Sequence, residues 1–118
     1  MPRKNKNIEI GKKGEDMAAD YLKRNNYRIL ARNYRSGRIE IDIIAIHDDQ
    51  LVFIEVKTRS GSEFGYPEES VDDTKQEAIQ TCAEDYILDT GWEGDIRFDI
   101  IGVSLHDPSP IYHIVDAF

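Results

Sequence analysis

The 118-residue sequence has a single cysteine and no long apolar run. Cys82 alone can form neither an internal disulfide nor a cysteine-based zinc site, which suits a reducing compartment. No apolar run reaches the roughly 18 residues that a membrane span needs, and no apolar signal core follows the basic start of the chain. We therefore expect a cytoplasmic protein with no membrane contact, forming one domain over residues 1–118 in which residues 1–7 are flexible.

Basic residues are scarce in the second half of the chain. Residues 1–60 contain 13 Lys and Arg against 9 Asp and Glu, a net charge of +4, whereas residues 61–118 contain 2 against 14, a net charge of −12. The total of −8 argues against nucleic-acid binding, which usually requires a basic surface. The uneven distribution nevertheless permits a local basic face. Ordinary solvated surface charge explains the same pattern.

Apolar spacing and turn residues predict the order αβββαββ, an α/β or α+β fold with a central mixed sheet flanked by helices. A polar turn is expected over residues 33–38, and Gly11 and Gly14 are expected to let the first helix approach the sheet closely. The expected elements are a helix at 8–25, strands at 27–32, 39–46 and 51–57, a helix that starts with a capping box at 70–73 and ends before Gly91, and strands at 96–105 and 111–115.

The second and third strands form a predicted hairpin around Asp48-Asp49. This register places Asp42 opposite Glu55 and Glu40 opposite Lys57, all on one face. The alternation puts Ile44, Ile46, Leu51 and Phe53 on that same face and Ile41, Ile43, Ala45, Val52, Ile54 and Val56 on the other.

Like charges directly opposed on paired strands are destabilising, and burial increases the cost. The Asp42–Glu55 repulsion can be relieved by protonation, by Lys57 or Arg59, or by a divalent cation such as Mg²⁺. Lys57 could hold an attacking water or stabilise charge on a phosphate. The structural alternative is a set of ion pairs, Glu40 with Lys57 and Asp42 with Arg59 or a backbone donor.

The first helix adds another acid. Glu15 lies on the stripe formed by Ala18, Ala19 and Leu22, which is the face expected to be buried. If the helix packs on the charged face of the hairpin, Glu15 points toward the two acids there. Alternatively, Glu15 is a first-turn acid favoured by the helix dipole, or a partner for Lys12.

These residues resemble the PD-(D/E)xK signature of restriction-endonuclease-like nucleases, with Asp42 followed by Glu55-Val56-Lys57. The wider pattern resembles the YraN-type family of small bacterial proteins, similar in layout to archaeal Holliday junction resolvases. Ile41 stands where the signature has proline, and Ile39 where the family usually shows glycine. The segments that carry the resemblance are Gly11–Glu15, Ala18–Leu22, Glu40–Ala45, Leu51–Arg59, Phe64–Pro67, Val71 with Lys75, and Arg97–Asp99.

The resemblance implies a restriction-endonuclease-like fold and a nuclease site dependent on Mg²⁺ or Mn²⁺. Asp42 and Glu55 would be metal ligands, Lys57 the catalytic lysine, and Glu15 the first-helix glutamate assisting them. The implied substrate is DNA, branched or damaged, and a homodimer is possible because resolvase-like relatives pair to cut symmetric junctions.

Several other residues are weighed between two roles. Arg59, Lys75, Lys12 and Lys13 are candidate phosphate contacts, although Arg59 could form a surface ion pair and Lys75 could snorkel to solvent. The loop at 64–67 is either a substrate-binding flap or a connector. Arg97 and Asp99 share a strand face as a structural pair, and His47, His106 and His113 show no metal-ligand spacing.

Three functions remain open from the sequence. The first is a metal-dependent nuclease, the second a nucleic-acid- or protein-binding module that keeps this fold without turnover, and the third a purely structural ionic core. The first requires the acids to converge, and acids that are splayed apart or neutralised by arginine would count against it.

Overall fold

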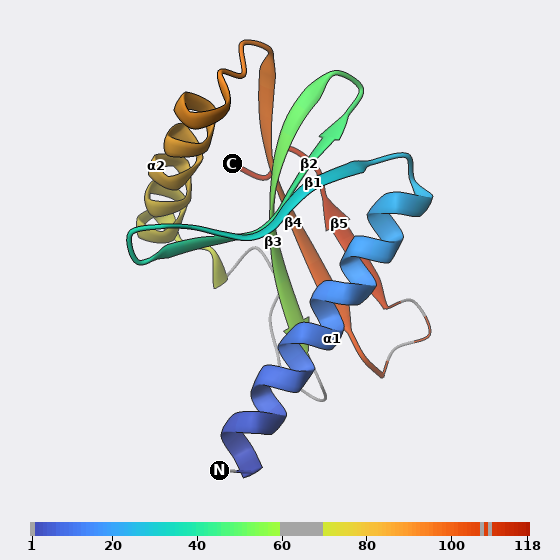
Figure 1. The fold of residues 1–118 in the computed structure, drawn as a ribbon. Coiled ribbons are helices and arrows are strands. Elements are labelled where there is room, and N and C mark those ends of the chain that lie inside the picture. Colours follow the sequence, from blue (N-terminus) through green and yellow to red (C-terminus); the bar gives the residue numbers. More distant parts are fainter. Residues whose placement is uncertain (1, 60–69, 107, 109) are drawn as a thin grey trace.

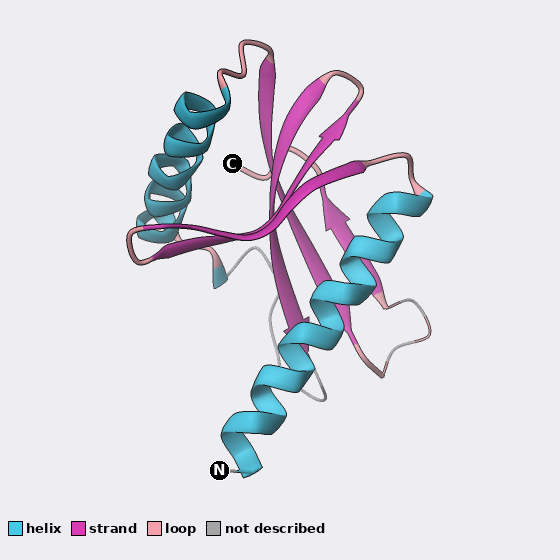
Figure 2. Cartoon of the chain, in the orientation of Figure 1, coloured by secondary structure: helices cyan, strands magenta, loops and turns pink. Residues whose placement is uncertain are grey.

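The fold is a five-stranded mixed sheet with one helix on each face (Figures 1 and 2). The computed structural model describes residues 2–59, 70–106, 108 and 110–118, with side chains from Ile8 onward. The strands lie in the order β1-β2-β3-β4-β5, which confirms the predicted αβββαββ arrangement. The elements are α1 (Pro2–Arg24), β1 (Arg28–Ser36), β2 (Ile39–His47), β3 (Gln50–Arg59), α2 (Asp73–Thr90), β4 (Asp95–Ser104) and β5 (Ile111–Ile114).

The hairpin between β2 and β3 has the predicted register. Asp48 and Asp49 both adopt left-handed φ angles, 48° and 62°, which is the geometry of a two-residue hairpin turn. The paired residues run from His47–Gln50 to Ile43–Ile54. The parallel pairing of β3 with β4 follows a crossover that contains α2. The sheet is therefore mixed, with its one parallel pair at the centre of the order.

Several predicted boundaries differ from the observed ones. β1 continues to Ser36 past Asn33, where a turn was predicted. The left-handed φ of 55° at Asn33 interrupts the regular strand geometry, and the turn falls at Gly37. α1 begins at Pro2, earlier than expected. The cap of α2 is Asp72, which accepts the backbone N–H of residue 75 at 2.9 Å. The predicted flap at 64–67, and most of the turn predicted at 107–110, lie outside the described residues.

Neither helix of the described chain combines the length and hydropathy needed to cross a membrane.

Each face of the sheet packs against its helix through its own apolar cluster. The α1 cluster includes Ala18, Ala19, Leu22, Ile43, Ala45, Val52 and Ile54, and the α2 cluster includes Ile41, Ile44, Leu51, Phe53, Ile79, Cys82 and Ala83.

Ile41 was predicted to share a face with Ile43 and lies instead in the α2 cluster, which corrects the expected alternation. Ile41 and Ile44 share one cluster while Ile43 belongs to the other, so the two-residue period is interrupted around Asp42. The neighbouring strand is irregular as well, with a register shift between Ile29 and Ala31. The interruption means that Asp42 need not face the same way as the other charged side chains of the hairpin.

Of the two glycines expected to let α1 approach the sheet closely, Gly14 does so against β3 and Gly11 does not. A Cβ atom at this position would lie 2.6 Å from Cγ2 and 2.7 Å from Cβ of Thr58, whereas a Cβ at Gly11 would have nothing within 4 Å. We predict that Gly14→Ala destabilises the protein by roughly 1–3 kcal/mol through overpacking. Gly11→Ala, the matched control on the same helix, should stabilise it by about 0.5–1 kcal/mol. Urea unfolding of both variants measures the difference, and equal shifts of the two would show that the close approach is unimportant.

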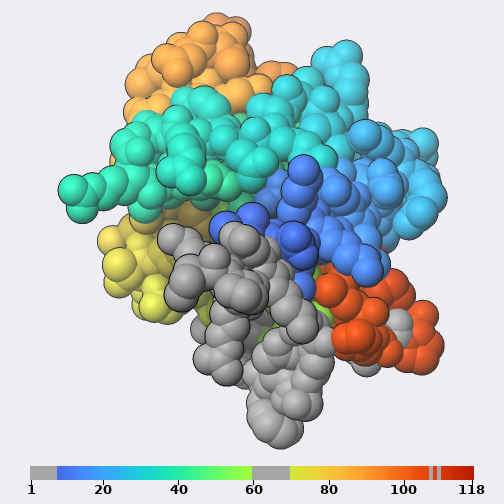
Figure 3. Space-filling model, turned by 60° about the horizontal axis from the view of Figure 1, so that its bottom comes forward, coloured from blue at the N-terminus to red at the C-terminus, as the bar shows by residue number. Residues whose placement is uncertain are grey.

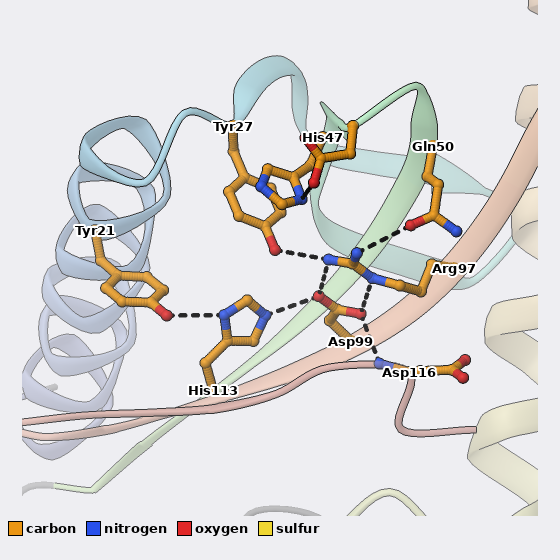
Figure 4. A network of polar contacts seen from close by, with 9 residues as sticks. Tyr21, Tyr27, His47, Gln50, Arg97, Asp99, His113 and Asp116 are labelled. Carbon is orange, nitrogen blue, oxygen red and sulfur yellow. Dashed lines mark hydrogen bonds and ion pairs between the residues drawn. The ribbon is translucent and has the colours of Figure 1, made fainter.

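A buried ionic network joins β4 to β3, to β5, to α1 and to Tyr27, which lies between α1 and β1 (Figure 4). Arg97 contacts both carboxylate oxygens of Asp99 at 2.8 Å, which confirms the predicted structural pair. Tyr27 and Gln50 accept from Arg97, at 2.6 Å and 3.1 Å. On the other side, His113 Nε2 lies 2.7 Å from Asp99. The network therefore connects three strands, β3, β4 and β5, to the C-terminal part of α1.

The network also explains how Asp99 stays charged although it is fully buried. Burial alone would raise its pKa, but hydrogen bonds from His113, from Arg97 and from the backbone N–H of Asp116 outweigh that effect and hold the pKa below its ordinary value. An ionised carboxylate only accepts, so His113 Nε2 donates, and Nδ1 accepts the Tyr21 hydroxyl at 2.9 Å. His113 is therefore part of the structural network.

Candidate metal centre

Asp42 lies where the pairing of β2 with β3 stops. The paired residues end at Ile43–Ile54, and one residue further the Asp42 carboxylate accepts the backbone N–H of Val56 at 2.8 Å. The direct opposition of Asp42 and Glu55 is therefore not part of the regular ladder. The two carboxylates still interact, since the Asp42 charge raises the pKa of Glu55.

Two acids, one from α1 and one from β2, lie close to Asp42. Glu15 of α1, Glu40 and Asp42 each offer a carboxylate oxygen, and these oxygens all lie within 4.8 Å of one another. α1 packs on the face of Ile43 and not on the charged face that was considered for it, but the interruption of the β2 alternation still brings Asp42 toward Glu15. The predicted meeting of Glu15 with Asp42 is therefore seen, by a different route.

Arginines of β1 neutralise the outer acids. Arg32 lies 3.4 Å from Glu15 and 2.7 Å from Asp16, and Arg35 lies 2.9 Å from Glu40. The predicted alternative pairing of Glu40 with Lys57 is thus replaced by Arg35. Among the described residues, the structure records no arginine paired with either inner acid, Asp42 or Glu55. Pairing with arginine, which would count against a cation site, therefore affects Glu15 and Glu40 and neither of the two inner acids.

Glu55 is the most buried acid of the site, with 5% of its surface exposed. Its Oε2 lies 3.7 Å from Nζ of Lys75 in the first turn of α2. Its Oε1 is buried without a hydrogen-bond partner among the described residues. Buried carboxylate oxygens are nearly always satisfied, so Oε1 is a candidate ligand atom for a cation or a water.

The pKa values of the two inner acids are raised by burial and by neighbouring charges. Burial, then the charges of Glu15 and Glu40, raise the pKa of Asp42 to about 6 against the opposing effects of the Val56 N–H and Lys57. Burial, then Asp42, raise the pKa of Glu55 to about 7. Both shifts mean that ionisation of the Asp42 and Glu55 carboxyl groups is less favourable in the folded protein than in water.

Lys57 lies beside both inner acids and beside Lys75. Burial lowers its pKa and so does the neighbouring Lys75, while Glu55 and Asp42 oppose the change. Lys57 therefore interacts electrostatically with both inner acids, whereas Glu55 is not one of the acids of the described chain whose oxygens lie within 4.8 Å of one another. A divalent cation with oxygen ligands fits the donor set, because it would satisfy Glu55 Oε1 and remove the repulsion between the carboxylates.

The other predicted phosphate contacts differ in their exposure. Lys12 and Lys13 are exposed on α1, and Arg59 is half-buried at the end of β3. Figure 3 shows α1, the β1–β2 hairpin and the start of α2 on one side of the molecule. The roles of Lys12, Lys13 and Arg59 as phosphate contacts stay predictions.

Glu40 and Arg32 belong to the site but were not predicted as site residues. Glu40 was assigned to the charged face of the hairpin and then to an ion pair, although its position two residues before Asp42 was a signal that it could join the group. Arg32 gave no signal, since its contact with Glu15 joins β1 to α1. Such contacts depend on how the helix crosses the sheet.

We predict that the metal-free protein loses stability as the pH rises. The folded-state pKa values of Asp42 and Glu55, about 6 and about 7, lie above the ordinary values of 3.8 and 4.5. Between these limits the folded protein holds protons that the unfolded chain releases, so unfolding becomes easier with rising pH by an amount on the order of 2 kcal/mol. Urea unfolding in chelator at pH 5 and pH 8 measures the loss.

The control is the double variant Asp42→Asn with Glu55→Gln, which cannot titrate at these positions. Its stability should change much less over the same interval. An equal change in the wild type and the double variant would mean that other groups cause the pH dependence.

The five-stranded mixed sheet with a helix on each face defines an α+β protein. The carboxylates that lie where β2 and β3 part form its candidate metal centre. The sequence matches the family described as "Uncharacterised protein family UPF0102" over residues 14–103. The chain belongs to this family, which confirms its resemblance to the YraN-type proteins.

Its relatives match it over nearly their full length. A UPF0102 protein of Chloroherpeton thalassium is 42% identical, covering 97% of this chain and 96% of the relative. One from Rhodococcus jostii is 43% identical, with 95% and 98% covered. One from Alkaliphilus oremlandii is 46% identical, with 95% and 99% covered.

Proposed function

We propose that this protein is a nuclease that hydrolyses phosphodiester bonds of DNA with the help of Mg²⁺ or Mn²⁺, acting on branched or damaged DNA. The observation that carries the proposal is the half-buried Asp42 with the buried Glu55, one of whose oxygens has no partner among the described residues, and with Lys57 interacting with both. The order of the elements and the Asp42…Glu55-x-Lys57 motif are also those of restriction-endonuclease-like nucleases.

Each residue has a definite task in this proposal. Asp42 and Glu55 hold the cation, and Glu15 assists from α1. The cation supplies Lewis acidity toward the phosphate and favours deprotonation of water. Lys57 orients the attacking water or stabilises the charge that develops on the phosphate. The Val56 N–H holds the Asp42 carboxylate in place, which limits the reorganisation needed on binding.

A binding module without turnover is the second candidate. It is favoured by the pairing of Glu15 and Glu40 with arginines, which leaves fewer free carboxylates for a cation. Such a module would bind nucleic acid, or a basic protein suited to the net charge of −8.

The experiment that separates the candidates has two arms. Mn²⁺ is titrated calorimetrically into the wild type and into Asp42→Ala, and junction, flap, nicked and single-stranded DNA are incubated with the protein and Mg²⁺ or Mn²⁺. We expect Mn²⁺ binding that Asp42→Ala abolishes, together with cleavage of at least one substrate. DNA binding without cleavage, weakening steeply with salt, would support the module instead. Absence of Mn²⁺ binding by the wild type would overturn the metal proposal.

A further inference from the structure

Lys75 has a fixed backbone and a side chain that lies between the buried site and solvent. Its backbone N–H is bound by Asp72, the N-cap of α2, at 2.9 Å. Its side chain reaches Glu55 from the opposite face of the sheet to α1, and 39% of that side chain is exposed. The ammonium group can therefore move between a carboxylate and a solvent-side partner without any change in the backbone.

The contact between Lys75 and Glu55 satisfies only part of the carboxylate. The Nζ–Oε2 distance of 3.7 Å is longer than a hydrogen bond, and Oε1 has no hydrogen-bond partner among the described residues. A cation of charge +2 held jointly by Glu55 and Asp42 would interact with both oxygens and both residues. Lys75 is thus a weak counter-ion at a place where a stronger one fits.

Lys57 lies next to Lys75. If Lys75 loses its contact with Glu55, its ammonium group lies beside that of Lys57 without a carboxylate to neutralise it. Two adjacent cations repel unless an anion lies between them. The first turn of α2 adds the positive end of a helix of 18 residues. A phosphate oxygen of a nucleic acid is an anion that reaches such a place from solvent.

We propose that Lys75 exchanges partners: it neutralises Glu55 in the metal-free protein, and it binds a phosphate oxygen of DNA once a divalent cation has taken Glu55. This inference rests on the proposed function, since it requires the cation at Asp42 and Glu55. It adds that metal and DNA binding are coupled through one side chain. DNA then gains a contact only when the site is loaded.

The first test is the affinity for Mn²⁺ in the absence of DNA, measured by calorimetry. Lys75→Met removes the competing charge, so we expect Mn²⁺ to bind about five- to tenfold more tightly than to the wild type. Lys75→Arg keeps the charge and should bind Mn²⁺ within about twofold of the wild type. Lys23→Met, at an exposed lysine in the last turn of α1, is the matched control and should not change the affinity.

The second test is the salt dependence of binding to a synthetic four-way junction. Each phosphate contact adds about 0.9 to the slope of log affinity against log salt. In chelator, Lys75→Met and the wild type should have equal slopes. Ca²⁺ takes the same kind of oxygen ligands. With Ca²⁺, the wild-type slope should be steeper than that of Lys75→Met by about 0.9, the contribution of one phosphate contact. Recovered DNA is checked for intactness on a gel.

The two failures are distinguishable. If the wild type does not bind Mn²⁺ through Asp42, the metal site and the exchange both fall. If the wild type binds Mn²⁺ but Lys75→Met leaves the affinity unchanged or weakens it, only the exchange is wrong. Equal slopes in both conditions, or a difference that persists in chelator, would also overturn the exchange.

Discussion

Glu55→Gln is expected to abolish DNA cleavage while making the metal-free protein more stable. The substitution keeps the shape of the side chain but removes the charge that a divalent cation needs and that burial and Asp42 make costly. We expect the single-turnover cleavage rate with Mn²⁺ to fall by at least ~10³-fold. Unfolding in chelator at pH 8 should require more urea than for the wild type.

The combination of the two results is the informative part. A purely structural ionic core predicts the gain in stability but no change in activity, whereas a general defect in folding predicts losses in both. Asp20→Asn, at an exposed acid of α1, is the control and should leave both quantities unchanged. A Glu55→Gln protein that cleaves DNA at the wild-type rate would exclude Glu55 as a metal ligand.

Arg97→Met is expected to produce the largest loss of stability in the protein. It leaves Asp99, which is fully buried, without its bidentate partner, and breaking a buried ion pair from one side costs about 3–5 kcal/mol. The variant also removes the partner of the Tyr27 hydroxyl. Urea unfolding at pH 7 measures the change in the free energy of unfolding.

Two further variants test whether the uncompensated charge causes this loss. The double variant Arg97→Met with Asp99→Leu removes both charges and should recover much of the stability. Arg35→Met breaks the more exposed pair with Glu40 and should cost less than about 1 kcal/mol. If the double variant is no more stable than Arg97→Met, the loss comes from packing around Arg97 and not from the charge left on Asp99.

The sequence predicted those parts of the fold that depend on local patterns. Alternation along the hairpin assigned Ile44 and Phe53 to one face and Ile43 and Ile54 to the other, as observed. The φ angles of the hairpin turn agree with the predicted register. Such features follow from the two-residue period of a strand and from turn chemistry, which are properties of neighbouring residues.

The departures have non-local causes. Ile41 lies on the unexpected face, and the break in alternation around Asp42 accompanies irregularities in β1, namely the register shift after Ile29 and the left-handed Asn33. The pairing of Glu40 with Arg35, and not Lys57, likewise depends on β1. These contacts are set by how neighbouring strands twist against each other, which the pattern within one strand does not contain.

The parallel pairing of β3 with β4 has a consequence for the order of assembly. β1, β2 and β3 are joined by short turns, whereas the segment between β3 and β4 contains the whole of α2. Contacts that close short loops form sooner during folding than contacts that close long ones. We therefore expect Asp42 and Glu55 to meet early in a nascent meander, before the counter-ion from α2 arrives, so that the mutual repulsion of the two carboxylates opposes the earliest stage of folding.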